Sequence, residues 1–320
     1  MPLSRQVRLG RLYSTPVEHT VSIIIPTLGA ECVLPGLLLR LRSQTLPPCE
    51  IIIVDSSSTD ATVDIARREG CRTETIPRET FRHGRARNTG ARLASSDVLV
   101  FMTQDALPTD NGFLAELIAP VAEGKTCASY ARQMAPPHAS PMEVFNRQFN
   151  YPAESRVKTL ADGSHLGVKT FFFSDVASAI SREVFEELGG FAEDIIANED
   201  MHFCARTLRA GHAVAYQADA VVLHSHDYSI ARQFRRYFDI GVFFAQAASL
   251  LRDVHGPRGE GWRYLSGQFC WLRSQRAWRL LPKSVVEAAA KFTAFQLGRA
   301  HRALPRWLNR RLSAQPGYWM

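Results

Sequence analysis

Two short apolar runs near the start of the chain predict buried β-strands. "VSIIIP" covers residues 21–26, and "EIIIVD" covers residues 50–55. Uninterrupted runs of this kind are typical of parallel strands that helices cover on both faces. Between them, "LPGLLLRLRSQTL" has leucines at helical spacing, and its Pro35 and Gly36 stand near the start, where a helix tolerates them best. The pattern therefore predicts one strand, helix and strand unit.

The alternation of strand and helix patterns continues to about residue 105. "SSTDATVDIARREG" predicts a capped helix, "CRTETI" a strand, "GRARNTGARLASS" a helix and "VLVFMT" another strand. This order predicts an open α/β sheet, in which ligands bind beyond the carboxyl ends of the strands. Thr27, Asp55 and Asp105 all fall at such ends.

Beyond residue 125 the patterns are weaker. "FFFSDVASAI" predicts a strand and loop, "SREVFEELGGF" a short helix, "NEDMHFCARTLRAG" a longer helix, and "AVAYQADAVVLHSH" two short strands. We therefore expect three regions: a basic extension without periodicity at residues 1–20, an α/β domain at residues 21–227, and a basic, mainly helical region at residues 228–320.

The composition indicates a globular protein whose positive charge is concentrated in its last third. Of the 320 residues, 46% are hydrophobic, and the formal net charge is +7. Residues 228–320 hold 16 Lys and Arg against 4 Asp and Glu. This balance predicts either a phosphate-bearing partner, anionic lipid or nucleic acid, or a solvated helical surface.

Cysteine usage and hydropathy suggest the compartment. The six cysteines are scattered without a C-x-x-C pair, which argues against a zinc ribbon or a disulfide framework and predicts reduced thiols. The N-terminal segment lacks the apolar core of a signal peptide, and no apolar run approaches the length of a membrane span. We therefore expect a cytoplasmic protein, soluble or attached to a membrane surface.

Asp55 and the segment "FRHGRARNTGAR" are candidates for nucleotide binding. A carboxylate after the second strand can accept hydrogen bonds from a base N–H or a ribose hydroxyl, although helix capping is an alternative. The turn "PTLGAE" has one glycine, which argues against a nicotinamide dehydrogenase, because that class needs G-x-G-x-x-G there. Arg87 and Asn88 offer donors to a diphosphate, with an ordinary solvated arginine helix as the alternative.

Two acidic sites and a histidine pair could carry the chemistry. Asp105, which ends "VFMTQD", can hold Mg²⁺ or Mn²⁺ bridging a diphosphate, or it can be an exposed loop acid. In "HSHD", His224 and His226 face the same way on a strand end, which suits a metal or diphosphate ligand or a structural role. Glu199 and Asp200 begin a helix, so one can cap it while the other acts as general base.

Taken in order, these segments resemble the family 2 glycosyltransferases, the large inverting group with the GT-A fold. The similarity covers roughly residues 20–230, and "TQDA", "FNYP", "HSHDYS" and "RRYFDIG" are similar to bacterial rhamnosyltransferases of O-antigen and other surface polysaccharides. The resemblance implies an α/β GT-A fold with a mainly parallel central sheet and a C-terminal helical extension. The segments that carry it are "VSIIIPTLGA", "IIIVDSSSTDAT", "HGRARNTGAR", "VFMTQDALP", "LGGF" and "NEDMHFCARTLRAG".

The resemblance also implies roles for individual residues. Asp55 would contact the nucleotide, Asp105 would hold Mg²⁺ or Mn²⁺ as cofactor, and Asp200 would be the base with Glu199 as its neighbour. His224 matches a further metal or diphosphate ligand better than His226. Asp105 stands alone where the family usually has a cluster of acids. The other expected nucleotide-sugar contacts are Pro26, Thr27, Arg87, Asn88 and Gln104.

The implied reaction is transfer of L-rhamnose from dTDP-rhamnose to a hydroxyl of a glycan or lipid-linked acceptor, with inversion. The expected partners are the sugar nucleotide, the acceptor and an anionic surface on the inner face of the cytoplasmic membrane. An oligomer is compatible with the sequence, and no nucleic acid is expected as a partner. Two alternatives stay open. A sugar-1-phosphate nucleotidyltransferase would need a basic loop that "PTLGAEC" lacks, and a nucleic-acid binder would use the tail's arginines with Trp262, Trp271, Trp278 and Trp307.

Overall fold

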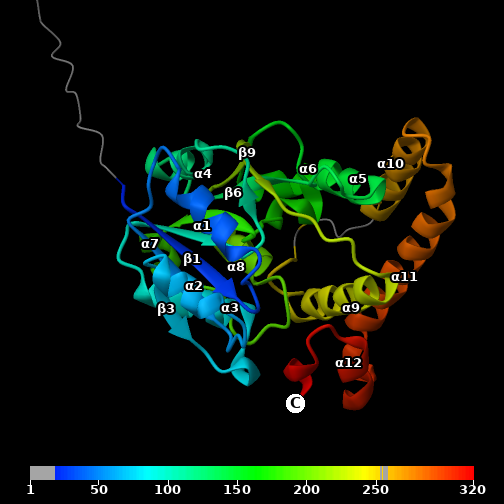
Figure 1. Cartoon of the computed structure of the whole chain (residues 1–320). Helices are drawn as coiled ribbons and strands as arrows, with labels where there is room; N and C mark the ends of the chain where they lie inside the picture. The colour runs from blue at the N-terminus through cyan, green and yellow to red at the C-terminus, as the bar shows by residue number, and fades with distance from the viewer. Residues whose placement is uncertain (1–18, 253, 255–258) are drawn as a thin grey trace, which may run out of the picture.

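A mixed β-sheet flanked by helices forms the body of the protein, and further helices lie to one side of it (Figure 1). The computed structural model describes residues 19–252, 254 and 259–320, so nearly all of the expected extension at 1–20 lies outside the described residues. The predicted alternation in the first hundred residues is confirmed. The strands are β1 (Val21–Thr27), β2 (Glu50–Asp55), β3 (Arg72–Thr75) and β4 (Val98–Met102), and the helices are α1 (Leu34–Arg42), α2 (Thr62–Arg68) and α3 (His83–Leu93).

The sheet order is β3-β2-β1-β4-β8-β6-β9-β5, and its first four strands are parallel. Strand β8 (Ala177–Ser181) runs antiparallel to both β4 and β6 (Ala128–Met134), whereas β9 (Val214–Leu223) runs parallel to β6. Two short strands, β5 (Leu107–Pro108) and β7 (Arg156–Lys158), pair antiparallel with β9. Because β8 is reversed relative to both neighbours, β9 points the same way as β1 and β4. The carboxyl ends of β1, β2, β4 and β9 therefore share one edge.

The segment predicted as two short strands is one strand, β9, so that prediction was wrong. The pairing of β9 with β6 passes from Ala131 opposite Gln217 to Arg132 opposite Val221. The extra residues on β9 form an irregularity, and a strand that contains one can continue with the same partner. The polar "QAD" in the middle reflects this local break in the pairing and not a turn.

Five helices connect the later strands. The predicted helices α7 (Arg182–Glu187) and α8 (Glu199–Arg209) are confirmed, whereas the sequence patterns did not identify α4 (Phe113–Ala122), α5 (Pro141–Asn150) and α6 (Gly163–Leu166). Helix α5 has a clear local cause: the Ser140 side chain accepts a hydrogen bond from the Glu143 backbone N–H, and Pro141 occupies the first turn.

The apolar core lies on both faces of the sheet. Ile23 and Ile25 of β1 pack on one face, and Ile24 packs on the other, as alternation along a strand requires. All three are fully buried, and each buried side chain of this size contributes about 1.5 to 3 kcal/mol to folding. Burial on both faces explains why the strand sequence shows no polar alternation.

The C-terminal region is mainly helical, as predicted, with helices α9 (Ile230–Gln246), α10 (Glu260–Ser274), α11 (Leu281–Arg299) and α12 (Arg306–Leu312). Phe238 and Phe243 of α9 belong to the same buried cluster as Phe101 of β4, so α9 is part of the main core. Helices α9 and α11 cross closely: a Cβ on Gly298 would lie 2.0 Å from the Phe238 carbonyl oxygen. In the described part of the chain, no helix has the length and apolar character needed to cross a membrane.

Candidate active site

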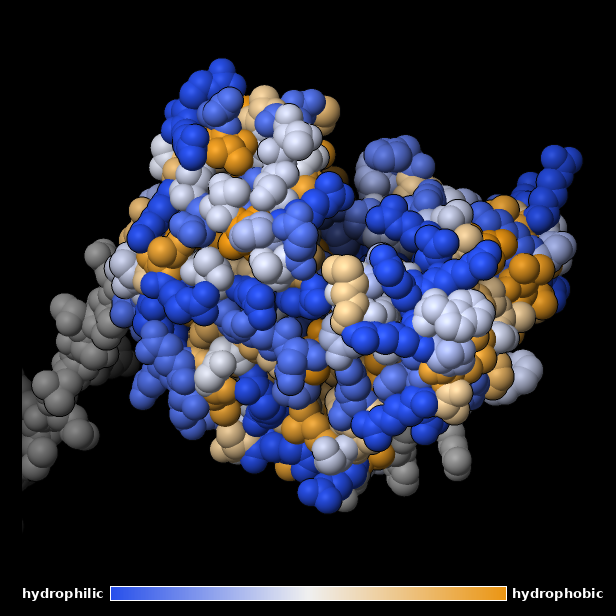
Figure 2. All heavy atoms as spheres, turned by 90° about the horizontal axis from the view of Figure 1, so that it is seen from below, coloured by the Kyte–Doolittle hydropathy of each residue, from blue (hydrophilic) through white to orange (hydrophobic). Residues whose placement is uncertain are grey.

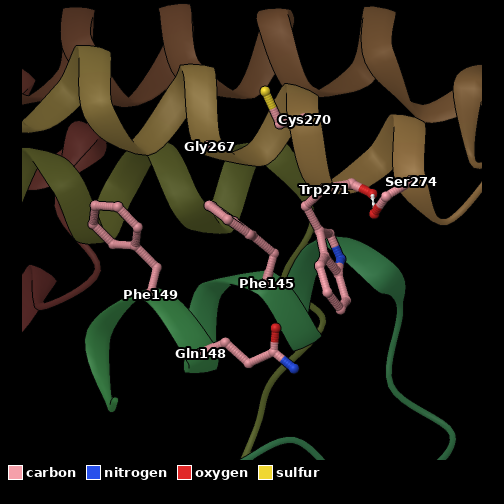
Figure 3. Close-up of a pocket in the computed structure, with 7 residues that line it drawn as sticks. All are labelled: Phe145, Gln148, Phe149, Gly267, Cys270, Trp271 and Ser274. Atoms are coloured by element: carbon pink, nitrogen blue, oxygen red, sulfur yellow. Dashed lines mark hydrogen bonds between the residues drawn. The ribbon is translucent and has the colours of Figure 1, made fainter.

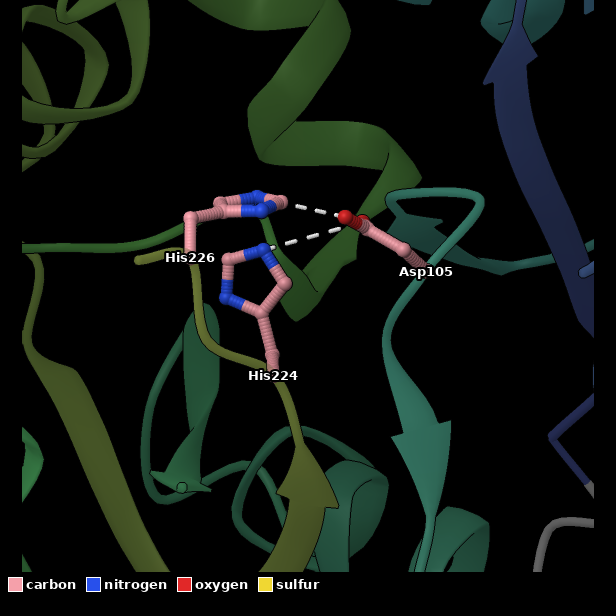
Figure 4. Close-up of side chains that lie close together, drawn as sticks. All are labelled: Asp105, His224 and His226. Atoms are coloured by element: carbon pink, nitrogen blue, oxygen red, sulfur yellow. Dashed lines mark ion pairs between the residues drawn. The ribbon is translucent and has the colours of Figure 1, made fainter. Parts of the chain in front are cut away.

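Asp105, His224 and His226 lie together at the sheet edge where β4 and β9 end (Figure 4). Their candidate ligand atoms all lie within 4.8 Å of one another. His224 Nε2 is 3.6 Å from one Asp105 carboxylate oxygen, and His226 Nε2 is 3.2 Å from the other. Among the described residues, these three form the one group of His, Cys, Asp or Glu side chains that could hold a metal ion, and they are the candidate metal-binding group. It contains the two predicted ligands, Asp105 and His224. It also contains His226, which the family resemblance favours less than His224 as a ligand.

Gln133 on β6 orients the His224 ring. Its side-chain oxygen accepts a hydrogen bond from Arg147 at 2.7 Å and lies 2.9 Å from His224 Nδ1. Because arginine can only donate, this atom must be the amide oxygen, and His224 Nδ1 must carry the proton that it shares with Gln133. The His224 Nε2 lone pair is therefore directed at Asp105. A second hydrogen bond that fixes the tautomer of a ligand histidine is typical of metal sites.

Burial keeps the His224 imidazole neutral. It lowers the pKa of His224 to about 3, and it also lowers the pKa of His226, while the nearby Asp105 charge acts in the opposite direction on both. A neutral imidazole is the form that binds a metal ion. One carboxylate and two imidazoles form a mixed oxygen and nitrogen donor set, which fits a transition-series dication better than Mg²⁺.

A second cluster of charged groups surrounds Arg87 on α3. Its guanidinium lies 2.8 Å from Asp175, just before β8, and 2.8 Å from Glu199, at the start of α8. The Arg87 side chain is 3% exposed, and both carboxylates are buried as well. A buried charge of this kind is tolerated only when it is paired. This ion-pair cluster therefore fixes the first turn of α8.

Asp200, the next residue on α8, is partly buried and differs from Glu199 in its contacts. One of its oxygens accepts the Met201 backbone N–H at 2.7 Å, and no side chain of the described residues makes an ion pair with it. Burial raises the pKa of Asp200 well above its usual value, and the charges of Asp175 and Glu199 raise it further. Burial also raises the pKa of Asp175 to about 7, although Arg87 opposes this. Asp200 thus differs from Glu199 and Asp175 in having no ion pair with Arg87.

Tyr151 links the two clusters. Its hydroxyl lies 2.6 Å from the Gln133 side-chain nitrogen, which donates to it. Burial raises the pKa of Tyr151 to about 12, and the nearby charges of Asp200 and Asp175 contribute to that increase. Tyr151 thus contacts the residue that orients His224, and the charges of the acidic cluster act on its hydroxyl.

The ends of β1 and β2 are tied together by Asp55. Its carboxylate accepts hydrogen bonds from the Thr27 hydroxyl and from both the backbone and the hydroxyl of Ser58. It is 0% exposed, so in this conformation it shapes the loop after β2. Gln104 holds the loop after β1: its side-chain oxygen accepts a hydrogen bond from the Leu28 backbone N–H, and its side-chain nitrogen donates one to the Leu28 carbonyl. Pro26 is partly exposed beside these residues, and direct contact of any of them with a nucleotide stays a prediction.

Comparison with known proteins agrees with this arrangement. Residues 22–189 match the family described as Glycosyl transferase family 2. The chain belongs to this family. The O-antigen chain rhamnosyltransferase RfbN of Salmonella typhimurium is 37% identical over 302 residues, which cover 93% of this chain and 96% of RfbN. WbaN of Salmonella anatum, also an O-antigen chain rhamnosyltransferase, is 38% identical over 87% of this chain and 88% of its own length.

Solved structures support the fold of this glycosyltransferase. The mannosyltransferase PcManGT from Pyrobaculum calidifontis, solved in complex with GDP-Man and Mn²⁺, aligns with a TM-score of 0.56. The alignment covers 94% of this chain and 85% of that one, at 22% sequence identity. The predicted GT-A type of α/β fold with C-terminal helices is confirmed, with the qualification that the parallel strands are concentrated in the first half of the sheet.

Arg87 and Asn88, both expected to contact the sugar nucleotide, are engaged inside the glycosyltransferase. Arg87 is held between Asp175 and Glu199, as described above. The Asn88 amide donates to the Phe191 carbonyl and to Glu193, and its oxygen accepts the Phe191 backbone N–H. These contacts hold the "LGGF" turn, where Gly190 has a φ of 71°. In this structure both residues support the loop before α8, and their contact with a sugar nucleotide stays a prediction.

Several residues of the site were not identified from the sequence: Gln133, Tyr151, Asp175 and Arg147. His226 had a usable signal, because the two-residue spacing in "HSH" places both rings on one side of a strand end. Tyr151 lies in the "FNYP" segment, which contributed to the family resemblance without a role being assigned. The other three had no local signal, since their partners lie on distant segments.

A shallow apolar groove lies away from the metal-binding group, between α5 and α10 (Figure 3). Its volume is about 450 Å³, and Phe145, Phe149 and Trp271 project into it. Helix α5 separates this groove from the site, because Arg147 on the same helix reaches Gln133. The groove is thus a feature of the contact between the C-terminal helices and the catalytic body.

Removal of the Gln133 amide should weaken metal binding. We expect Gln133→Leu to lower Mn²⁺ affinity about 10- to 100-fold, because His224 loses the partner that orients it. Gln133→Glu keeps an acceptor at the same point and should retain most of the affinity. Gln148→Leu, an exposed glutamine on α5, is the matched control. Calorimetric titration with Mn²⁺ measures the effect, and equal affinities in the leucine variant and the parent would contradict it.

Proposed function

We propose that this enzyme transfers L-rhamnose from dTDP-rhamnose to the growing glycan of a surface polysaccharide, with inversion at the anomeric carbon. The rhamnosyl specificity is supported by the two O-antigen chain rhamnosyltransferases, which match over nearly their whole lengths. The observation that carries the mechanism is the close grouping of Asp105, His224 and His226 at the sheet edge, which is connected through Gln133 to Tyr151, whose hydroxyl the Asp200 charge affects. Membership of the glycosyltransferase family argues against the two alternative functions, a sugar-1-phosphate nucleotidyltransferase and a nucleic-acid binder.

Asp105, His224 and His226 would hold Mn²⁺, which supplies positive charge against the leaving diphosphate. Mn²⁺ is preferred over Mg²⁺ here because two of the three donors are imidazole nitrogens. His224 is already in the tautomer that such an ion requires.

Asp200 would act as the general base. An acceptor hydroxyl is a weak nucleophile, so its proton passes to an Asp200 oxygen while its oxygen bonds to the anomeric carbon. The bond from that carbon to the diphosphate oxygen breaks at the same time, and the nucleoside diphosphate leaves. Attack from the face opposite the leaving group inverts the configuration. Arg87 and Asp175 are positioning residues, because they hold Glu199 and the first turn of α8.

A donor screen tests this function. The purified enzyme with Mn²⁺ is given dTDP-rhamnose, UDP-glucose or GDP-mannose together with a lipid-linked acceptor, and the product linkage is determined by NMR. Rhamnosyl transfer with inverted configuration supports the proposal. Transfer from another donor would overturn the rhamnosyl specificity, and retention of configuration would overturn the role of Asp200.

We further propose that the C-terminal helices attach the enzyme to an anionic membrane surface, where a lipid-linked acceptor would be located. Large aromatic side chains are exposed there, with Trp262 77% and Trp307 65% exposed, and arginines flank them in the sequence. Hydrophobic and hydrophilic residues are interspersed on the molecular surface (Figure 2). Two other tryptophans of this region pack inward: Trp271 donates to the Pro141 carbonyl, and Trp319 contacts Phe238. Exposed aromatic and basic side chains together are typical of helices that lie in the headgroup region.

Vesicle binding tests this attachment. The parent should sediment with vesicles that contain phosphatidylglycerol and release as salt rises, because each Lys or Arg near the surface contributes about 1 kcal/mol or less. The paired change Trp262→Ser and Trp307→Ser should reduce binding, whereas Leu39→Ser, an equally exposed residue on α1, should not. Absence of binding at low salt would refute the attachment, and self-association lost in the tryptophan variant would assign the surface to a dimer.

A further inference from the structure

Arg87 is buried between two carboxylates, whereas the start of α9 offers two exposed cationic side chains for the leaving diphosphate. Tyr228, two residues after His226, stacks on the His226 ring with the centroids 4.9 Å apart. On the same tyrosine ring lie the guanidinium carbons of Arg232, 4.2 Å from its centroid, and Arg236, 5.2 Å from it. A single aromatic ring therefore separates these two guanidiniums from a ligand of the metal-binding group.

Both arginines are positioned by the sequence spacing. They are four residues apart on α9, so they project from one face of the helix and meet the same ring. The segment that holds Tyr228 is itself anchored, because Asp227 accepts hydrogen bonds from the backbone and hydroxyl of Ser140. The tyrosine platform thus holds two otherwise flexible side chains near the site before any ligand binds.

The charge of both arginines is unbalanced. Arg232 and Arg236 are exposed, and within the described ranges neither has a carboxylate at ion-pair distance. Two guanidinium groups without an ion-pair partner among the described residues therefore lie next to the Tyr228 ring, which stacks on His226.

We propose that Arg232 and Arg236, held on Tyr228, bind the β-phosphate of the nucleoside diphosphate and stabilise it as the leaving group. Guanidinium groups form charge-assisted, often bidentate hydrogen bonds with phosphate oxygens, and such bonds are about twice as strong as neutral ones. This inference rests on the proposed function, because it names the residues that would neutralise the diphosphate of the donor together with the metal-binding group. Tyr228 is a positioning residue in this arrangement.

Calorimetric binding of dTDP and dTMP in the presence of Mn²⁺ tests the proposal, because the two ligands differ by the β-phosphate. The parent should bind dTDP more tightly than dTMP. The double variant Arg232→Gln and Arg236→Gln should lose about 10- to 100-fold in dTDP affinity, while dTMP affinity changes little. Arg235→Gln is the matched control, since Arg235 is an exposed arginine of the same helix with no contact to the Tyr228 ring in the described structure.

The outcomes separate the two proposals. Unchanged dTDP affinity in the double variant, with a parent that binds dTDP, overturns the role of the arginines and leaves the proposed function intact. An equal loss for dTDP and dTMP also overturns it, because the effect would then not involve the β-phosphate. A parent that binds UDP or GDP and not dTDP contradicts the proposed donor, and the same comparison made with that nucleotide and its monophosphate then decides the arginine role.

Discussion

Replacement of Asp105 by alanine should abolish transfer and leave the fold intact. Asp105 supplies the negative charge of the metal-binding group, and without it His224 and His226 alone form a weak site. Charge stabilisation by a bound metal ion is worth several kcal/mol, so we expect a loss of at least about 10³-fold in the rate of transfer. The Asp105 side chain is 33% exposed at the end of a strand, so the melting temperature should change by only a few degrees.

The measurement is transfer from dTDP-rhamnose, with Mn²⁺ binding and thermal unfolding recorded for the same samples. Asp219→Ala is the matched control, because Asp219 is an exposed acid on β9, the strand that also leads to His224. Full activity of the Asp105 variant, or parent activity that resists EDTA, would contradict metal-assisted departure of the diphosphate.

Sequence patterns predicted the first half of the fold well because its determinants are local. Strands β1 and β2 are β-branched runs that few other structures accommodate, and leucines at helical spacing mark helix α1 between them. Asp105 and His224 could be identified for the same reason, since each directly follows an apolar strand. The sheet edge then brings them together although they are 119 positions apart in the sequence.

Residues whose role depends on distant partners could not be assigned from the sequence. Arg87 stands in a segment with several arginines, and its pattern suits a solvated surface or a phosphate site equally well. Its burial follows from Glu199, which is 112 residues away, and from Asp175. Gln133 likewise becomes a support of His224 only because β6 pairs with β9. Tertiary pairing of this kind leaves no periodic signal along the chain.

The second large effect is expected at Asp200. We expect Asp200→Asn to reduce kcat by about 10² to 10⁴, because an amide cannot take up the proton of the acceptor hydroxyl. Affinity for dTDP should remain close to that of the parent, because the residues proposed to hold the diphosphate are Asp105, His224, His226 and the α9 arginines, and Asp200 is not among them. A loss that appears only as weaker dTDP binding would show that Asp200 is a ligand contact and not the base.

The pH dependence of kcat provides an independent test of the same residue. A general base works in its ionised form, so the rate rises as the pH increases through its pKa. Burial and the neighbouring carboxylates raise the pKa of Asp200 well above its usual value, so the rising limb in the parent should lie well above pH ~4, the range of an ordinary carboxyl group. That limb should be absent from the residual activity of Asp200→Asn.

Glu199→Gln should retain the limb and mainly lower the melting temperature, because it leaves the buried Arg87 with one carboxylate partner in place of two. A flat profile between pH 5 and 8 in the parent, together with full activity in Asp200→Asn, would remove Asp200 from the reaction.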